Sequence, residues 1–276
     1  MALSLDKLEK DLAGKDGELL SLAKKTKLSL EKNQLNGVEA KVAVCLDISY
    51  SMSNLYSSGA ISQLVKKLIP LGISFDDDGE IDVFTFGEKG GQQESINLGN
   101  YIPRLDSLKN IKLEGATNYS EAISLVDSHY SSEPDVKDVP VYVIFITDGD
   151  ASDRSKAEAA MKRISKYPIF FQFVALGEDY TPDNTAKTPE PEDPKKGFFG
   201  RLFGGDSTSQ SSRPNTRRSQ FQFLIDLDDM SGRVVDNAGF FAVKTPDSKE
   251  PSELYDLMMG EFPDFLTEAK RVGVLN

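Results

Sequence analysis

The feature that most constrains the fold is an apolar run at residues 139–147, VPVYVIFIT, which passes directly into the acidic stretch DGD. A strand whose side chains are buried on both faces has this pattern, and such strands are typical of parallel sheets covered by helices on both sides. Shorter runs of the same kind occur at residues 41–46 (KVAVCL) and 168–176 (PIFFQFVAL). The chain is therefore expected to bury a sheet between two helical layers.

Amphipathic segments separate these runs. Residues 61–69 place apolar side chains at i, i+3, i+4, i+7 and i+8, one face of a helix, and residues 157–164 repeat the pattern. In residues 116–130, Asn118 and Glu121 have capping-box spacing ahead of a third helix. Residues 80–88 read as an alternating strand. Strands alternating with helices predict an α/β fold with a doubly wound, mostly parallel, Rossmann-like sheet.

The ends of the chain and one internal segment depart from this alternation. Residues 1–37 predict an N-terminal helical extension, with amphipathic patterns at 3–12 and 18–32, and residues 38–276 predict the main domain. Residues 181–219 are rich in Pro, Ser, Thr and Gly, which predicts a long flexible insertion. After it we expect a short helix, a strand and a last helix at 252–271, which Pro263 should break or kink.

Composition excludes several classes of function. The net charge of −12 argues against a nucleic-acid-binding surface, and a single Cys45 and a single His129 exclude an internal disulfide and a zinc cluster built from such ligands. Cys45 lies in an apolar strand pattern, so we expect a small buried side chain. The N-terminus lacks the apolar region of a signal peptide, and no stretch approaches the length of a membrane span, so a cytoplasmic location is expected.

Five oxygen-bearing residues follow strands or precede a helix: Asp47, Ser49, Ser51, Thr117 and Asp148. The carboxyl ends of parallel strands meet at one edge of a sheet, where ligands bind, so these side chains are expected to converge. Their oxygens suit a hard divalent cation, Mg²⁺ first and Mn²⁺ or Ca²⁺ as alternatives. Taken singly, each of these residues is also explained as a helix cap or a turn residue. Asp153, close by, is expected to act as the N-cap of the next helix.

The segments DISYSM (47–52), GATNY (115–119) and ITDGD (146–150) together resemble the metal-ion-dependent adhesion site (MIDAS) of von Willebrand factor A (VWA) domains. The resemblance covers about residues 38–180 and the strand and helix after 220. The stretches 19–32 and 223–241 resemble the TerF-like branch of the family, which belongs to bacterial tellurium-resistance and stress-response systems.

The resemblance implies a role for each of the five residues. Ser49, Ser51 and Thr117 would be direct hydroxyl ligands, and Asp47 and Asp148 would act directly or through water. It also implies a function: a Mg²⁺-dependent interaction module that docks a carboxylate of a protein partner onto the ion.

Two other functions compete with this one. A metal-dependent hydrolase would use the same oxygens, but no plausible base accompanies them, and a DxDxT phosphatase would need a second aspartate where Ser49 stands. We therefore expect no enzyme. A membrane-peripheral scaffold is suggested by residues 195–205, KKGFFGRLFGG, whose aromatic and basic side chains suit weak contact with an acidic membrane or a protein groove. A plain linker explains that stretch as well.

Overall fold

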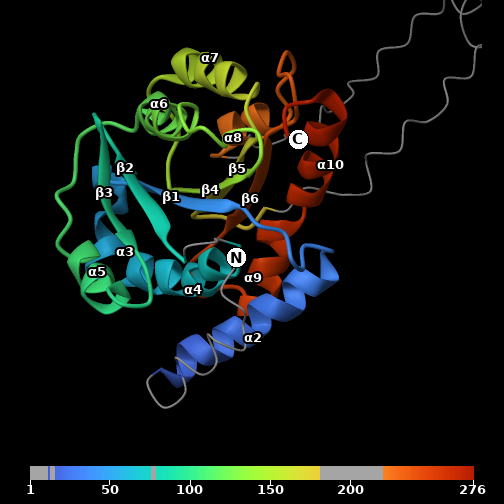
Figure 1. Ribbon diagram of the computed structural model, residues 1–276. Helices are drawn as coiled ribbons and strands as arrows, with labels where there is room; N and C mark the ends of the chain where they lie inside the picture. The colour runs from blue at the N-terminus through green and yellow to red at the C-terminus, as the bar shows by residue number, and fades with distance from the viewer. Residues whose placement is uncertain (1–11, 13–15, 76–78, 181–219) are drawn as a thin grey trace, which may run out of the picture.

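The computed structural model describes residues 12, 16–75, 79–180 and 220–276 (Figure 1). The expected helix at 3–12, the insertion at 181–219 and the basic-aromatic stretch at 195–205 therefore lie almost entirely outside the described residues. Within them, a six-stranded sheet has the order β3-β2-β1-β4-β5-β6. Its strands are β1 (Lys41–Asp47), β2 (Ile81–Phe86), β3 (Gly90–Ile96), β4 (Val141–Thr147), β5 (Ile169–Leu176) and β6 (Ala238–Val243).

The sheet confirms the expected doubly wound α/β architecture. Strand β1 pairs in parallel with β2 on one side and with β4 on the other, and β5 and β6 continue the parallel order. Edge strand β3 is antiparallel to β2, and the sequence analysis did not predict it. Its sequence, GGQQESI, is polar, and of its side chains only Ile96 is buried in the core. Hydrophobic periodicity therefore gives no signal for it.

Helices cover both faces of the sheet (Figure 1). One face carries α6, α7 and α8, and the other carries α2, α4, α5, α9 and α10. The helices have these bounds: α2 (Gly17–Lys32), α3 (Ser53–Ser57), α4 (Ala60–Phe75), α5 (Tyr101–Leu108), α6 (Tyr119–Tyr130), α7 (Arg154–Ile164), α8 (Gln222–Asp228), α9 (Pro251–Met259) and α10 (Phe262–Val272).

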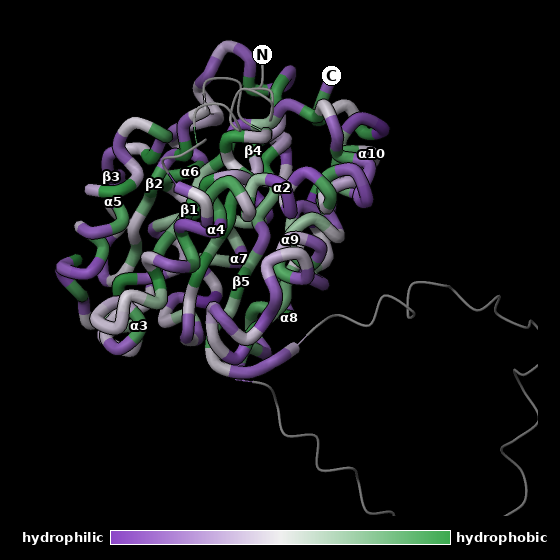
Figure 2. The backbone as a smooth tube through the Cα atoms, turned by 90° about the horizontal axis from the view of Figure 1, so that it is seen from below, coloured by the Kyte–Doolittle hydropathy of each residue, from purple (hydrophilic) through white to green (hydrophobic). Residues whose placement is uncertain are grey.

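Successive side chains of a strand point to opposite faces of the sheet, so each inner strand contributes to the apolar core on both faces. In β1, Val44 and Leu46 pack toward α4, whereas Ala43 and Cys45 pack toward α6. All of β4 is buried, as its apolar run predicts, and Cys45 is fully buried, also as predicted. In Figure 2, the apolar colour lies mainly along the inner strands, such as β5, and the polar colour lies mainly along outer turns.

Helix α2 is attached closely to the main domain. It packs against α4 and α9, and its Leu19 and Leu22 belong to the same apolar core as the strands. Its Ser29 hydroxyl donates to the Asp256 carboxylate of α9, and Lys32 forms an ion pair of 2.5 Å with the same group. The domain boundary near residue 38 stays a prediction, because this helix shares its core with the rest of the fold.

The last helical segment is divided in two. Helix α9 ends at Met259 and α10 begins at Phe262, with Pro263 in its first turn. The predicted break is therefore confirmed, and it lies just before the proline because Pro is accepted in the first turn of a helix, where its missing N–H costs nothing. No helix among the described residues is long and apolar enough to cross a membrane.

Candidate metal centre

The centre of the candidate site is Asp47, the last residue of β1. Its carboxylate is buried and accepts hydrogen bonds from the Ser49 backbone N–H at 2.7 Å and from the Thr147 hydroxyl at 2.6 Å. The Tyr56 hydroxyl donates to the Asp47 backbone carbonyl at 2.8 Å. These three donors, from the following turn, the neighbouring strand and α3, hold the carboxylate at the carboxyl edge of the sheet.

A chain of side-chain oxygens leads from this carboxylate to the surface. The Ser49 and Ser51 hydroxyls lie 2.9 Å apart, and the Ser51 hydroxyl donates to the Asp148 carboxylate at 2.6 Å. Ser49 is buried, Ser51 is exposed and Asp148 is half-buried. The structure thus brings together four of the five predicted residues in one hydrogen-bonded series that ends at solvent.

Backbone hydrogen bonds position Thr117 next to the site. The turn before it is joined to the β1 loop, since the Glu114 N–H donates to the Ile48 carbonyl at 2.8 Å and the Tyr50 N–H donates to the Glu114 carbonyl at 3.0 Å. Thr117 itself exchanges two bonds with Ser152: its N–H donates to the Ser152 hydroxyl at 3.3 Å, and the Ser152 N–H donates to its carbonyl at 2.9 Å. These bonds use the Thr117 backbone and place the residue between the β1 and β4 loops.

The N-terminus of α6, directly after Thr117, is capped by another element. The Asp153 carboxylate accepts from the Tyr119 N–H at 2.9 Å and from the Ser120 N–H at 3.1 Å. The expected capping box is therefore wrong: Asn118 occupies the N-cap position without a side-chain cap bond, and its amide donates to the Glu88 carbonyl. Asp153 does stand at the N-cap position of α7, but its side chain caps α6 because the two loops lie side by side.

The two carboxylates at the site have perturbed acidities. Burial, with a smaller contribution from the nearby Asp148 charge, raises the pKa of Asp47 to about 6 against the opposing hydrogen bonds from Thr147 and Ser49. Burial also raises the pKa of Asp148, opposed by the Ser51 hydroxyl. Among the described residues, neither carboxylate has an ion-pair partner.

A hard divalent cation fits this arrangement. It would favour the ionised form of both carboxylates, and the hydroxyls beside them are oxygen donors of the kind that such ions accept. Within the described part of the chain there is no cluster of three or more His, Cys, Asp or Glu side chains that could hold a metal, so hydroxyl oxygens would have to complete the ligand set here.

Two contributors were missed by the sequence analysis. Thr147 and Tyr56 hold Asp47 in place. Thr147 lies within the ITDGD segment but was not singled out, and Tyr56 belongs to none of the three segments. The single histidine lies elsewhere: His129 Nε2 is 3.2 Å from the Asp82 carboxylate, and Asp82 lies near the beginning of β2, at the other edge of the sheet. It therefore offers no base to the site.

A sequence comparison places the chain among known proteins. The family model vWA-TerF-like, described as the vWA domain found in the TerF C terminus, matches residues 39–181 and 215–275. A relative from Bacillus subtilis (strain 168), the uncharacterized protein YcbR, is 27% identical over 258 residues, which cover 91% of this chain and 88% of the relative.

Solved structures resemble the fold at low sequence identity. An aerotolerance-related membrane protein from Bacteroides fragilis is 18% identical, with a TM-score of 0.50, over 82% of this chain and 99% of that chain. A mussel byssus protein, proximal thread matrix protein 1, has zinc in its MIDAS motif. It is 16% identical, with a TM-score of 0.41, over 51% of this chain and 39% of that protein.

Proposed function

The chain belongs to the TerF-like family of von Willebrand factor A domains, and from this premise we propose that it is a Mg²⁺-dependent protein-interaction module. The ion would be held by Asp47, Ser49, Ser51, Thr117 and Asp148, and would dock a carboxylate of a protein partner. The setting that the family suggests is a bacterial tellurium-resistance or stress-response system.

The observation that carries the proposal is the oxygen series from Asp47 to Asp148. A buried carboxylate is costly unless its charge is compensated. Here the Asp47 carboxylate lies at the buried end of a series of side-chain oxygens that continues through Ser49 and Ser51 to Asp148 at the surface. A bound divalent cation would supply the missing positive charge. Three of the five proposed ligands are neutral hydroxyls, so the ion would keep affinity for one more anionic oxygen, which a partner's Asp or Glu can provide.

The chain's own residues would prepare this interaction. Thr147 and the Ser49 N–H fix the orientation of the Asp47 carboxylate, so that little ordering remains to be done on binding. Ser51 and Asp148 lie at the surface end, where a partner has access. A hydrolase using the same oxygens remains the second candidate, but within the described residues no histidine or other base accompanies them, and we favour binding over catalysis.

Thermal unfolding tests ion binding. Mg²⁺ at one hundred times its Kd should stabilise the wild type by about 2.7 kcal/mol, because the unfolded chain holds no preformed site. Thr117→Ala and Ser51→Ala should lose most of this gain. The matched control is Ser57→Ala, an exposed serine of α3 whose hydroxyl bonds only within its own turn. An equal Mg²⁺ shift in all four proteins would refute the ion site.

Partner docking needs a separate measurement. Immobilised full chain should retain a protein from a bacterial lysate in Mg²⁺ and release it with EDTA, and the Thr117→Ala variant should not retain it. Substituting the partner's acidic residues in turn should then abolish retention at one of them. Retention that is insensitive to both chelator and variant would contradict docking through the ion, whatever the thermal data show.

A further inference from the structure

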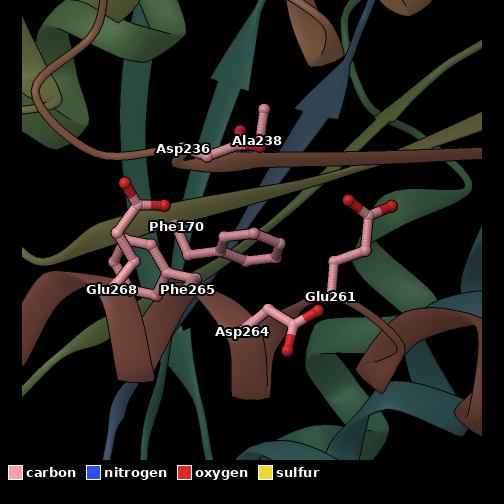
Figure 3. A pocket seen from close by; sticks show the side chains of 7 residues that line it. All are labelled: Phe170, Asp236, Ala238, Glu261, Asp264, Phe265 and Glu268. Carbon is pink, nitrogen blue, oxygen red and sulfur yellow. The ribbon is translucent and has the colours of Figure 1, made fainter. Parts of the chain in front are cut away.

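A pocket between β5, β6 and α10 is acidic, but its wall offers no aromatic surface to a ligand. The carboxylates that line it, shown in Figure 3, belong to Asp236, Glu261, Asp264 and Glu268. The rings of Phe170 and Phe265 are 1% and 2% exposed and pack on each other with centroids 5.2 Å apart. Nothing in the described part of the chain indicates what such a pocket would bind. The contacts that bear on function lie instead beneath the candidate metal centre.

A buried tyrosine contacts both acid-bearing parts of that centre. Tyr119 is the first residue of α6 and the last of the GATNY segment, and its side chain is fully buried. Its hydroxyl donates to the Gly149 backbone carbonyl at 2.6 Å. The same hydroxyl lies 3.4 Å from the Thr147 hydroxyl, which donates to the Asp47 carboxylate at 2.6 Å. One phenol group therefore contacts the residue after Asp148 and the group that orients Asp47.

The turn that carries Asp148 is closed on the same hydroxyl. The Gly149 N–H donates to the Thr147 hydroxyl at 3.2 Å, so the residues on either side of Asp148 are tied to each other. Thr147 thus accepts from this turn and donates to Asp47. Because Tyr119 holds the carbonyl of the same Gly149, a displacement of the turn would disturb the positions of both carboxylates.

The Tyr119 side chain is itself held firmly. Its backbone N–H is capped by the Asp153 carboxylate at 2.9 Å. Its ring packs among aromatic rings of β4, β2 and α8, with centroid distances of 4.9 Å to Phe145, 5.8 Å to Phe86 and 6.1 Å to Phe223. Burial raises the pKa of the Tyr119 hydroxyl well above its ordinary value, so the group remains a donor at neutral pH. The core therefore fixes the place of this donor.

Holding the two carboxylates together requires such a support. Asp47 and Asp148 are close enough for their charges to interact, and like charges repel where no cation lies between them. We propose that Tyr119 is a positioning residue of the candidate metal centre, which keeps the Asp47 and Asp148 carboxylates at a separation that one cation can bridge. The consequence for affinity rests on the ion binding proposed above, whereas the positioning itself is a property of the ion-free protein.

A second tyrosine provides a matched control. Tyr255 of α9 is also fully buried, and its hydroxyl also donates to a backbone carbonyl, that of Lys67, at 2.7 Å. It belongs to the core on the opposite face of the sheet. Tyr119→Phe and Tyr255→Phe each keep the ring and remove one buried hydroxyl, so we expect both to lower the melting temperature. Only Tyr119→Phe should affect the carboxylates.

Amide hydrogen exchange in the Mg²⁺-free, full-length protein measures the positioning. In Tyr119→Phe, the Gly149 and Ser49 amides should exchange at least about tenfold faster relative to amides in the middle of β5, because the loops open locally. In Tyr255→Phe, these ratios should stay as in the wild type. A purely structural Tyr119 would change the exchange of all these amides through global stability alone. Equal ratios in the two variants would overturn the proposal.

Calorimetric titration with MgCl₂ measures the consequence for the ion. Loss of a group that orients metal ligands typically weakens binding by about 10–100-fold, and we expect this for Tyr119→Phe. Tyr255→Phe should bind as the wild type does, and equal affinity of all three proteins would contradict a positioning role. A wild type that binds no Mg²⁺ would refute the proposed function, and the exchange ratios of the ion-free protein would still decide whether Tyr119 holds the two carboxylates.

Discussion

Replacing Asp153 with alanine should destabilise the fold through a helix to which Asp153 does not belong. In the wild type its half-buried carboxylate accepts two backbone N–H groups at the start of α6, at 2.9 and 3.1 Å. Loss of an N-cap costs about 0.5–2 kcal/mol. Loss of a negative charge at a helix N-terminus adds about 0.3–1 kcal/mol. We therefore expect the free energy of unfolding to fall by about 2 kcal/mol.

Urea denaturation followed by circular dichroism measures this value. Asp153→Asn keeps one acceptor oxygen and should lose roughly half as much as the alanine variant. The control is Asp150→Ala: Asp150 is exposed and pairs with Arg154 at the surface, where such pairs contribute about 0–1 kcal/mol. If Asp153→Ala costs no more than Asp150→Ala, the cross-element cap does not stabilise α6.

Three further changes test other parts of the structure. Tyr56→Phe removes the donor to the buried Asp47 carbonyl and should lower the free energy of unfolding by about 1–3 kcal/mol in urea titrations, with an unchanged urea m-value. Burial raises the pKa of Asp228 in the folded protein to about 8, from 3.8, so the free energy of unfolding falls as the pH rises between these two values. Asp228→Asn should therefore raise the melting temperature more at about pH 8 than at about pH 5. A gain that does not depend on pH would contradict this. Burial raises the pKa of the Cys45 thiol, so a thiol reagent should modify it only at the rate of unfolding, and rapid labelling of the native protein would show that the strand opens locally.

Most of the fold could be predicted from the sequence because its signals are strong and local. The apolar run of β4 and the one-sided pattern of α4 each follow from burial, and both elements appear where they were expected. Among the elements that were missed, β3 is polar, and α3 and α5 are short, with few buried side chains each. Strand β3 pairs with β2 and buries only Ile96 of its seven residues, so it has no apolar face that would reveal it in the sequence.

The candidate site divides in the same way. Asp47 and Asp148 could be placed because they follow strands whose ends must meet at one edge of a parallel sheet. The supports could not: Thr147 reaches Asp47 from the neighbouring strand, and Asp153 caps a helix that begins far away in the sequence. These contacts depend on how the loops pack in three dimensions, which the local sequence pattern does not indicate. Ion binding at these oxygens stays a prediction.

Backbone hydrogen bonds attach the segment after β5 to β6, and this attachment bears on where the fold tolerates insertions. Tyr180 exchanges two backbone hydrogen bonds with Ala242 of β6, of 3.0 and 2.8 Å, and Phe221 packs near Phe240 of the same strand. Gly177 and Gln220 also lie against each other. Residues 177–180 and 220–221 thus lie at the same edge of the domain. The free-energy cost of closing a loop between two fixed points rises by only about 0.6 kcal/mol for each doubling of the loop length. We therefore expect this position to accept segments of very different length while the candidate metal centre keeps its geometry.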